Sequence, residues 1–308
     1  MLRAFFIHLS ENRSWRNFAE RSSLGQRLSG RFVAGTEIAD AVRVTDAVNR
    51  AGMTVSIDNL GENVSNADEA RTSAKLYHQI LDAIAANGLQ GNISLKLTHM
   101  GLDVDENLAR DLVSGLVSKA ASMSPPGFVR VDMEGSPYTQ RTLDLVHELH
   151  RMPGNGNSVG TVIQAYLRRS EKDVEKLLGE RIRIRLCKGA YKEAASIAFE
   201  RKSEVDCNYI RLMKILMKSG IYHGLATHDE RIIREAEAFA RREKIPPDAF
   251  EFQMLYGIRR DLQHSLVRAG WRVRVYVPFG TEWYPYFMRR LGERPANIFF
   301  LARNLLRA

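Results

Sequence analysis

The sequence is poor in the residues that build metal centres and disulfide frameworks. Its only two cysteines, Cys187 and Cys207, are too far apart for a C-x-x-C pair. Zinc sites and disulfide-rich scaffolds use closely spaced cysteines or mixed Cys and His clusters. Thr227 and His228 stand together, but no second histidine or carboxylate lies at the spacing of a zinc ligand. We therefore expect no metal site and two buried thiols.

Long apolar segments and targeting signals are also missing. No apolar run approaches the ~18 residues that a helix needs to cross a bilayer. The first ten residues include Arg3 and His8 and lack a small-residue cleavage site, so they do not resemble a signal peptide. These absences predict a cytoplasmic protein.

Negative charge is scarcer than positive charge, and the formal net charge is +9. Such an excess permits attraction to nucleic acid, anionic lipid or an anionic substrate. The basic residues are dispersed, with no arginine-rich tail, zinc finger or RNA-binding signature. We expect no nucleic-acid partner.

Short β-rich segments alternate with helical patterns after Gly52. The β-rich segments are residues 54–58, 93–98, 128–132, 159–164, 182–187, 222–226, 250–253 and 273–277. Helical periodicity lies between them at residues 66–87, 106–122, 138–151, 172–179, 204–219 and 230–244. Eight strands alternating with helices predict an α/β fold, a (β/α)8 TIM-type barrel. The alternative is an open doubly wound sheet, but its glycine-rich G-x-G-x-x-G turn is absent.

The first 50 residues differ from the rest of the chain in their residue pattern. A periodic helical pattern at residues 39–48 follows a turn, and nothing strand-like precedes it. We expect residues 1–50 to form an N-terminal helical segment packed on the barrel. Residues 51–308 then form a single catalytic barrel domain.

The predicted strands alternate between aliphatic and polar residues. Buried parallel strands are usually continuously apolar, so the polar set must point into the barrel and be paired, wet or covered by a ligand. The polar residues nearest the strand ends fall at the C-terminal rim, where barrel enzymes keep their sites. They are Asp58, Lys96, Asp132, Gln164, Arg185 and Tyr276. The alternative is that Lys96 with Asp132, and Arg183 with Glu251, are buried ion pairs without a catalytic role.

One short helix is predicted at residues 281–295, because Thr281 suits its start and Pro295 its end. Phe287, Met288 and Leu291 lie roughly opposite a polar stripe on this helix. That stripe consists of Tyr286, Arg289, Arg290 and Glu293. Two guanidiniums side by side suit a small carboxylate, which they bind in a bidentate manner. A solvated charged face is the alternative.

The rim residues and the last predicted helix together carry a family resemblance, which runs from about residue 34 to the C-terminus. The motifs are Ile57-Asp-Asn-Leu-Gly-Glu62, Ser94-Leu-Lys-Leu-Thr98, Arg130-Val-Asp-Met-Glu134, Gln164-Ala-Tyr166, Lys188-Gly-Ala-Tyr191, Ala226-Thr-His-Asp229, Phe250-Glu-Phe-Gln-Met-Leu-Tyr-Gly257, Tyr276-Val-Pro278 and Tyr286 to Glu293. In these motifs the chain resembles the flavin-dependent proline dehydrogenases, including the proline-oxidising domain of bifunctional proline-utilisation enzymes. With no aldehyde-dehydrogenase domain and no DNA-binding arm, it is similar to the short monofunctional bacterial form.

The resemblance implies a distorted (β/α)8 barrel with non-covalent FAD over the strand ends. It implies oxidation of L-proline to 1-pyrroline-5-carboxylate, with the electrons passed to a membrane quinone. Flavin contacts are implied for Met133, Gln164, Arg185, Lys188, Gly189, Ala190, Thr227 and His228. Proline contacts are implied for Lys96, Asp132, Tyr191, Leu255, Tyr276, Tyr286, Arg289, Arg290 and Glu293.

Physical chemistry agrees with a catalytic part for two of the residues that the resemblance implies, Arg185 and Asp132. A fixed cation such as Arg185 near the flavin stabilises the electrons that the flavin receives. Asp132 is expected to offset the charge of Lys96 and to hold it in place. Glu62 follows the first predicted strand and is expected to act as a gate by pairing with Arg289 across the site mouth. An exposed loop glutamate is the alternative for Glu62.

Two other functions stay open from the sequence. One is a flavoenzyme for a related cyclic amine, such as hydroxyproline or pipecolate, and the other is a non-catalytic barrel that binds an anion. A quinone acceptor also predicts weak, peripheral contact with the inner membrane face through residues 297–307, which mix apolar and cationic residues at helical spacing. The alternative is that these residues pack as the last helix of the barrel.

Overall fold

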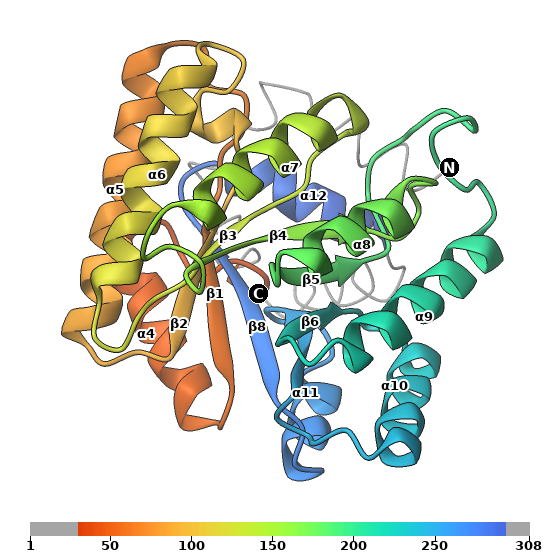
Figure 1. Cartoon of the computed structure of the whole chain (residues 1–308). Helices are drawn as coiled ribbons and strands as arrows, with labels where there is room; N and C mark the ends of the chain where they lie inside the picture. Colours follow the sequence, from red (N-terminus) through yellow and green to blue (C-terminus); the bar gives the residue numbers. More distant parts are fainter. Residues whose placement is uncertain (1–29, 294–308) are drawn as a thin grey trace.

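The computed structural model describes residues 30–293, with side chains as far as residue 288. Eight parallel strands close into a barrel in the order β1 to β8, with β8 beside β1, and helices surround it (Figure 1). The strands are β1 (Thr54–Asn59), β2 (Gly91–Leu95), β3 (Val129–Val131), β4 (Val159–Gln164), β5 (Arg183–Cys187), β6 (His223–Ala226), β7 (Phe250–Leu255) and β8 (Val273–Phe279). The predicted TIM-type barrel is confirmed.

Each strand connects to the next through at least one helix, as parallel pairing requires. The helices are α4 (Ile38–Arg50), α5 (Ala67–Ala86), α6 (Glu106–Ser122), α7 (Ser136–Arg151), α8 (Ser170–Gly179), α9 (Lys202–Lys218), α10 (Glu230–Glu243), α11 (Arg260–Arg268) and α12 (Trp283–Glu293), with the short 3-10 helix η1 (Thr98–Met100) after β2. Among the described residues, no helix is long and apolar enough to span a membrane.

Local sequence explains where several helices begin. The side chain of Asn66 accepts hydrogen bonds from the first-turn N–H groups of α5, and Asp105 does the same for α6. These caps satisfy N–H groups that have no partner inside the helix. Helix α11 was not predicted from the sequence. Its only buried residues are Gln263 and Leu266, which give a weak apolar period.

The aliphatic face of each strand packs against the helices, as the alternation predicted. Val55 and Ile57 of β1, Ile93 of β2 and Val275 of β8 are fully buried in one core cluster with apolar residues of the helices. Helix α4, predicted at residues 39–48, adds Ala41 to this cluster. The boundary between an N-terminal segment and the barrel stays a prediction.

The polar face of the strands points into the barrel, also as predicted. Glu251 and Arg274 form a buried ion pair, with 2.6 Å between Arg274 Nε and Glu251 Oε1. The pairing of Arg183 with Glu251, considered as the alternative, is therefore wrong. Arg274 lies on β8, next to the strand of Glu251, whereas Arg183 lies two strands away on β5 and stacks over the ring of Phe128.

The two cysteines are not both buried. Cys187 is half-buried at the end of β5 and Cys207 is exposed on α9. The expectation of two buried thiols is wrong for Cys207, because this position of α9 faces solvent while its neighbours Tyr209 and Leu212 face the core.

His223 gives the barrel a testable dependence on pH. Its Nδ1 accepts a hydrogen bond from Ile184 N (3.0 Å), so Nε2 carries the proton and faces Ser219 Oγ at 3.0 Å. Burial, and then the charges of Arg130 and Arg183, lowers the pKa of His223 to about 3 from 6.5. Below about pH 6.5 the His223 side chain of the unfolded chain is protonated, whereas that of the folded chain stays neutral until the pH approaches about 3. The unfolding free energy therefore falls as pH falls from about 6.5 towards about 3.

We expect His223→Gln to reduce the slope of the unfolding free energy against pH by up to about 1.4 kcal/mol per pH unit. Urea denaturation at a series of pH values between about 5 and about 6.5 measures this slope. His264→Gln, at an exposed position of α11, is the control and should keep the wild-type slope. Equal slopes in wild type and His223→Gln would mean that His223 is protonated in the folded protein.

Candidate active site

A cleft of about 720 Å³ opens at the C-terminal rim of the barrel. Apart from Glu62, all predicted site residues with described side chains line it. They are Lys96, Asp132, Met133, Gln164, Arg185, Lys188, Gly189, Ala190, Tyr191, Thr227, His228, Leu255, Tyr276 and Tyr286. They come from strands β4, β5, β7 and β8, from the segments that follow β2, β3, β5 and β6, and from α12. The fold thus brings together residues that are up to 190 positions apart, from residue 96 to residue 286.

Arg185 is the buried centre of the floor of this cleft. One of its terminal nitrogens donates to Asp132 Oδ1 at 2.7 Å and to Ser94 Oγ at 3.1 Å. The other donates to Ser56 Oγ at 3.0 Å, and Nε donates to Gln253 Oε1 at 2.5 Å. These partners from β1, β2, β7 and the end of β3 fix the guanidinium in one orientation. Such a fixed cation is preorganised for negative charge in the cleft.

Asp132 is occupied by Arg185 and does not pair with Lys96, contrary to expectation. Tyr276 also donates its hydroxyl to Asp132 Oδ2 (3.1 Å), and Ser94 Oγ donates to Oδ1 (2.7 Å). Because its oxygens already have these partners, Asp132 acts on Lys96 only at longer range. The expectation that Asp132 offsets the charge of Lys96 is confirmed, because its charge raises the pKa of Lys96, but the direct contact that was expected to hold Lys96 is wrong.

Lys96 pairs instead with Asp58, with 3.5 Å between Nζ and Oδ2. Burial lowers the pKa of Lys96, but the carboxylates of Asp58 and Asp132 more than offset this, so the pKa is raised above its usual value. Burial raises the pKa of Asp58, and Lys96 opposes that rise. Tyr77 also donates to Asp58 Oδ1 (3.2 Å) from α5. Lys96 is therefore a protonated cation at the cleft, suited to holding a carboxylate.

Two tyrosines on the wall of the cleft stay protonated. Burial, followed by the negative charges of Asp58 and Asp132, raises the pKa of Tyr276 well above its usual value. Burial is also the main cause of the raised pKa of Tyr191. Both phenols are therefore neutral, and the single hydroxyl proton of Tyr276 is already donated to Asp132.

Lys188 and Gly189, which follow β5, also line the cleft. Lys188 Nζ lies 2.5 Å from Asp206 Oδ1 and 2.9 Å from Asp229 Oδ2, which fixes it against α9 and α10. Gly189 has φ +115°, and a Cβ there would collide with the ring of Tyr166. A glycine is required for this close approach of backbone to ring. Nothing in the sequence pointed to Asp206, because only the tertiary fold brings α9 beside this loop.

His228 and Thr227 are set by the backbone around them. His228 Nε2 accepts a hydrogen bond from Leu255 N at 2.9 Å, so a neutral His228 carries its proton on Nδ1. Thr227 Oγ1 accepts from Asp229 N at 3.0 Å, at the start of α10. The loop after β6 is thereby fixed to the end of β7.

Gln164 and Met133 are positioned through Glu134. The Nε2 of Gln164 donates to the carbonyl of Glu134 at 2.9 Å. The Glu134 carboxylate in turn accepts from Thr98 N (3.1 Å) and Thr98 Oγ1 (2.6 Å). This buried set joins the ends of β2, β3 and β4, and Met133 lies within it, 6% exposed.

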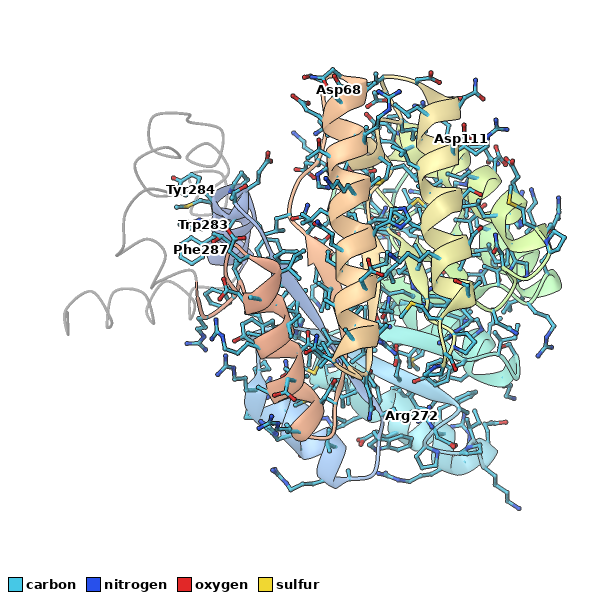
Figure 2. All side chains as sticks on the ribbon, turned by 90° about the vertical axis from the view of Figure 1, so that its left-hand side faces the viewer. Asp68, Asp111, Arg272, Trp283, Tyr284 and Phe287 are labelled. Carbon is cyan, nitrogen blue, oxygen red and sulfur yellow. The ribbon has the colours of Figure 1, made fainter. Side chains whose placement is uncertain are left out.

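Helix α12 begins at Trp283, two residues later than predicted, and its backbone is helical to Glu293. Trp283, Tyr284 and Phe287 pack on Phe32 and a small second core, and Figure 2 shows the three together at one edge of the molecule. Tyr286 belongs to the same second core and also lines the cleft. The predicted apolar side is confirmed for Phe287 and Met288, whereas Tyr286 contacts both the core and the cleft. The side chains of Arg289, Arg290, Leu291 and Glu293 lie outside the described set.

Glu62 lies beside the cleft without lining it. It contributes to the raised pKa of Lys96, after Asp58 and Asp132. Its neighbour Gly61 packs so tightly on the His99 ring that a Cβ would collide with it. The loop that carries Glu62 is therefore held at the rim.

Some lining residues were missed from the sequence. Val162 and Met254 lie beside predicted residues and offered no polar signal. Ser56, which binds Arg185, stands two positions before Asp58 and shares its inward parity, so the alternation could have found it. Lys202, the first residue of α9, also lines the cleft, and the predicted boundaries place it in the loop after the fifth strand, where no motif singled it out.

Comparison with known proteins gives the family. The model of the family described as proline dehydrogenase matches residues 41–303. The chain belongs to the proline dehydrogenase family. Its relatives include Proline dehydrogenase 1 of Bacillus subtilis (strain 168), 41% identical over 308 residues and covering 100% of both chains. Proline dehydrogenase of Deinococcus radiodurans is 41% identical over 283 residues, 91% of this chain and 90% of the relative.

A solved structure supports the same assignment. Proline utilization A (PutA) from Bdellovibrio bacteriovorus, inactivated by N-propargylglycine, superimposes with a TM-score of 0.80 and 27% identity. The match covers 87% of this chain and 32% of that one. This proline dehydrogenase family member thus spans about a third of the larger PutA chain.

The ion pair at the floor of the cleft can be tested through stability. Asp132→Asn leaves the Arg185 guanidinium, 7% exposed, without its carboxylate. Because breaking a buried pair strands the other charge, we expect a loss of about 3 kcal/mol in unfolding free energy, measured by urea denaturation. Asp103→Asn is the matched control, since its pair with Arg141 is solvent-exposed and should cost less than about 1 kcal/mol. Equal losses in the two variants would show that Asp132 is not needed to neutralise Arg185.

Proposed function

We propose that this chain oxidises L-proline to 1-pyrroline-5-carboxylate with non-covalently bound FAD and passes the electrons to a membrane quinone. The observation that carries the proposal is the grouping of Lys96, Arg185 and Lys188 around one rim cleft. The chain that builds this cleft is 41% identical, end to end, to Proline dehydrogenase 1 of Bacillus subtilis.

The lining of the cleft fits a flavin nucleotide. Its donors include the fixed cations Arg185 and Lys188 and the amide of Gln164, which suit the carbonyl and phosphate oxygens of such a molecule. Gly189 gives the backbone room to approach a ligand. Met133, Gln164, Arg185, Lys188, Gly189, Ala190, Thr227 and His228 would hold it. When bound, FAD supplies the acceptor for the two electrons removed from the substrate.

The remaining residues orient the substrate. Lys96 is kept protonated by Asp58 and Asp132, so it binds the proline carboxylate and does not act as a base. We assign Arg289, Arg290 and Glu293, whose side chains lie outside the described set, to the same grip. Tyr191, Leu255, Tyr276 and Tyr286 enclose the ring. Holding the carboxylate at one end and the ring at the other aligns the reacting carbon.

Asp132 and Arg185 form the catalytic pair in this proposal. Asp132 holds Arg185 at 2.7 Å, and Arg185 places a fixed positive charge at the cleft floor. That positive charge would stabilise negative charge that develops in the cleft. The guanidinium need not reorient to do so, because Ser56 and Gln253 also bind it.

Glu62 is proposed as the gate of the site. Its loop is packed against His99, and its charge acts on Lys96. Pairing of Glu62 with Arg289 would exclude water while the substrate reacts. We place the protein in the cytoplasm, with weak peripheral contact at the inner membrane face through residues 297–307, which lie outside the described residues.

Anaerobic addition of L-proline to the purified protein tests the function. We expect the visible absorbance of oxidised flavin to bleach. Bleaching by hydroxyproline or pipecolate, but not by proline, would assign the chain to a related cyclic amine. Protein that stays colourless after FAD is added would instead point to a binding module.

Tyr276 should determine which ring is accepted. Tyr276→Ser removes the ring from the cleft wall and leaves space where a substrate hydroxyl would otherwise collide. We expect activity on hydroxyproline to rise relative to that on proline, with some loss for proline. The ratio of kcat/KM for the two substrates measures this. An unchanged ratio would remove Tyr276 from substrate selection.

Arg289→Met and Arg290→Met test the carboxylate grip. Each removes charge-assisted hydrogen bonds worth about 2 to 5 kcal/mol, so we expect kcat/KM for proline to fall roughly 30-fold to several-thousand-fold. Arg→Lys should rescue only in part, since a lysine cannot bind a carboxylate in a bidentate manner. Flavin content should survive, because packing rests on Trp283 and Phe287. Changes within about 0.5 kcal/mol in both variants would place these arginines on a solvated face.

A further inference from the structure

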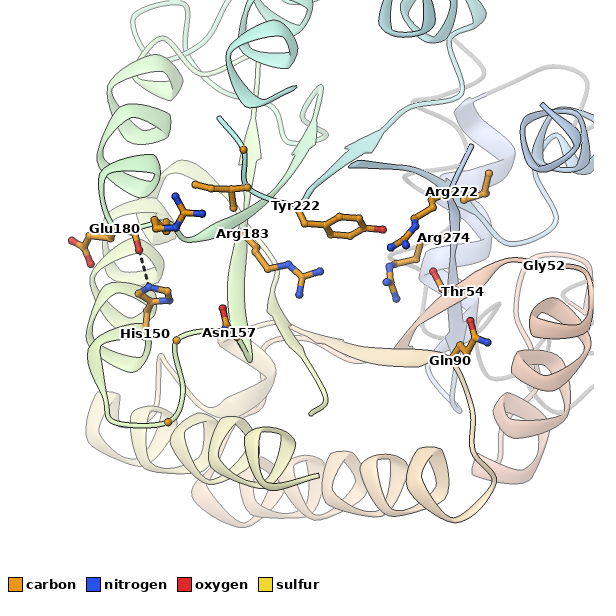
Figure 3. A pocket seen from close by; sticks show the side chains of 16 residues that line it. Gly52, Thr54, Gln90, His150, Asn157, Glu180, Arg183, Tyr222, Arg272 and Arg274 are labelled. Atoms are coloured by element: carbon orange, nitrogen blue, oxygen red, sulfur yellow. Dashed lines mark hydrogen bonds between the residues drawn. The ribbon is translucent and has the colours of Figure 1, made fainter. Parts of the chain in front are cut away.

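A second hollow lies at the opposite, N-terminal mouth of the barrel. It encloses about 1040 Å³ and is lined where β1, β5 and β8 begin (Figure 3). Arg272, one of its residues, lies at the other end of the molecule from Asp68 at the start of α5 (Figure 2). The rim cleft and this mouth share no lining residue. The mouth is therefore a separate cavity.

Positive charge is in excess at this mouth. The arginines that line it are Arg181, Arg183, Arg272 and Arg274, whereas the lining carboxylate is Glu180. Glu180 is already engaged, because it accepts a hydrogen bond from Arg151 Nε at 3.1 Å and lies 3.0 Å from His147 Nδ1. Arg272 pairs with Asp248 at 3.8 Å and Arg274 with Glu251 at 2.6 Å, so among the described residues Arg181 and Arg183 are the lining arginines without a carboxylate partner at ion-pairing distance.

Of the arginines that line this mouth, Arg183 is the best placed to bind an anion. Its guanidinium stacks over the rings of Phe128 (4.3 Å) and Tyr222 (5.0 Å), and its Nε is buried without a hydrogen-bond partner. Within the described part of the chain, no carboxylate lies at ion-pairing distance from Arg183, whereas its neighbour Arg274 pairs with Glu251 at 2.6 Å. A buried donor without an acceptor is costly, and a bound anion would remove that cost.

We propose that the N-terminal mouth binds a soluble small molecule through its phosphate group, with Arg183 as the anchor and Arg272 and Arg274 beside it. A phosphate carries nearly two charges at neutral pH and three acceptor oxygens, so it can contact several guanidinium forks at once. Figure 3 shows Arg183, Arg274 and Tyr222 projecting into this space.

The rest of the lining favours a polar, water-soluble ligand. Thr54, Gln90 and Asn157 offer hydrogen-bonding groups, while the aliphatic side chains are those of Ile221 and Val273. Two aliphatic side chains give little surface for an acyl chain, so a lipid is disfavoured. This inference does not depend on the chemistry proposed for the rim.

Isothermal titration of the FAD-saturated protein with inorganic phosphate, at constant ionic strength, tests the site. Saturating with FAD keeps phosphate out of the rim cleft. We expect saturable binding of one phosphate, weakened at least about tenfold by Arg183→Gln. Arg272→Gln should weaken binding several-fold. It should not impair folding, because the Arg272 side chain is 56% exposed. It carries the test if Arg183→Gln fails to fold.

Arg71→Gln is the matched control, since it removes the same charge from an exposed position of α5. It should bind phosphate as wild type does. Absence of saturable heat at millimolar phosphate would overturn the proposal. Equal weakening by Arg71→Gln and Arg272→Gln would also overturn it, because binding would then reflect net charge alone. Vesicles with phosphatidic acid that bind where free phosphate does not would refute the soluble ligand.

Discussion

The barrel depends on the neutralisation of charge inside it. Most TIM-type interiors are filled by branched aliphatic side chains, whereas this one holds Arg130, Arg185, Arg274 and Glu251 among others. Arg185 is held by two hydroxyls, an amide and a carboxylate, and Arg130 donates to the carbonyl oxygens of Thr161 and Arg183. Each strand must keep its register for these bonds to form. In this barrel, polar contacts therefore determine the strand register, which apolar packing determines in most others.

Close packing of backbone makes part of this interior possible. Gly160 on β4 lies against the carbonyl of Arg183 and the guanidinium of Arg130, where a Cβ could not fit. Gly224 on β6 leaves space for the side chain of Gln253 in the same way. The interior arginines and glutamine therefore need glycines on neighbouring strands, and the two kinds of residue must be understood together.

The sequence predicted correctly which strand residues face into the barrel, but it did not predict which charged residues pair with each other there. Alternation along each strand predicted which residues face inward, because side chains of a strand alternate by simple geometry. Which cation meets which carboxylate depends on register and on competition. Lys96 meets Asp58 because Asp132 is taken by Arg185, Ser94 and Tyr276. Contacts from helices, such as that of Asp206 with Lys188, left no periodic signal at all.

The Glu251 carboxylate links the two ends of the barrel. Its Oε1 accepts from both Arg274 and Gln253 at 2.6 Å, and Gln253 in turn accepts from Arg185 at the cleft floor. Residues of the two mouths are thus joined by a short, unbroken series of hydrogen bonds. Substitutions at opposite ends of such a series share partners, so their effects on stability should not add. For anyone who redesigns this protein, the interior is a single unit in which each position constrains the rest.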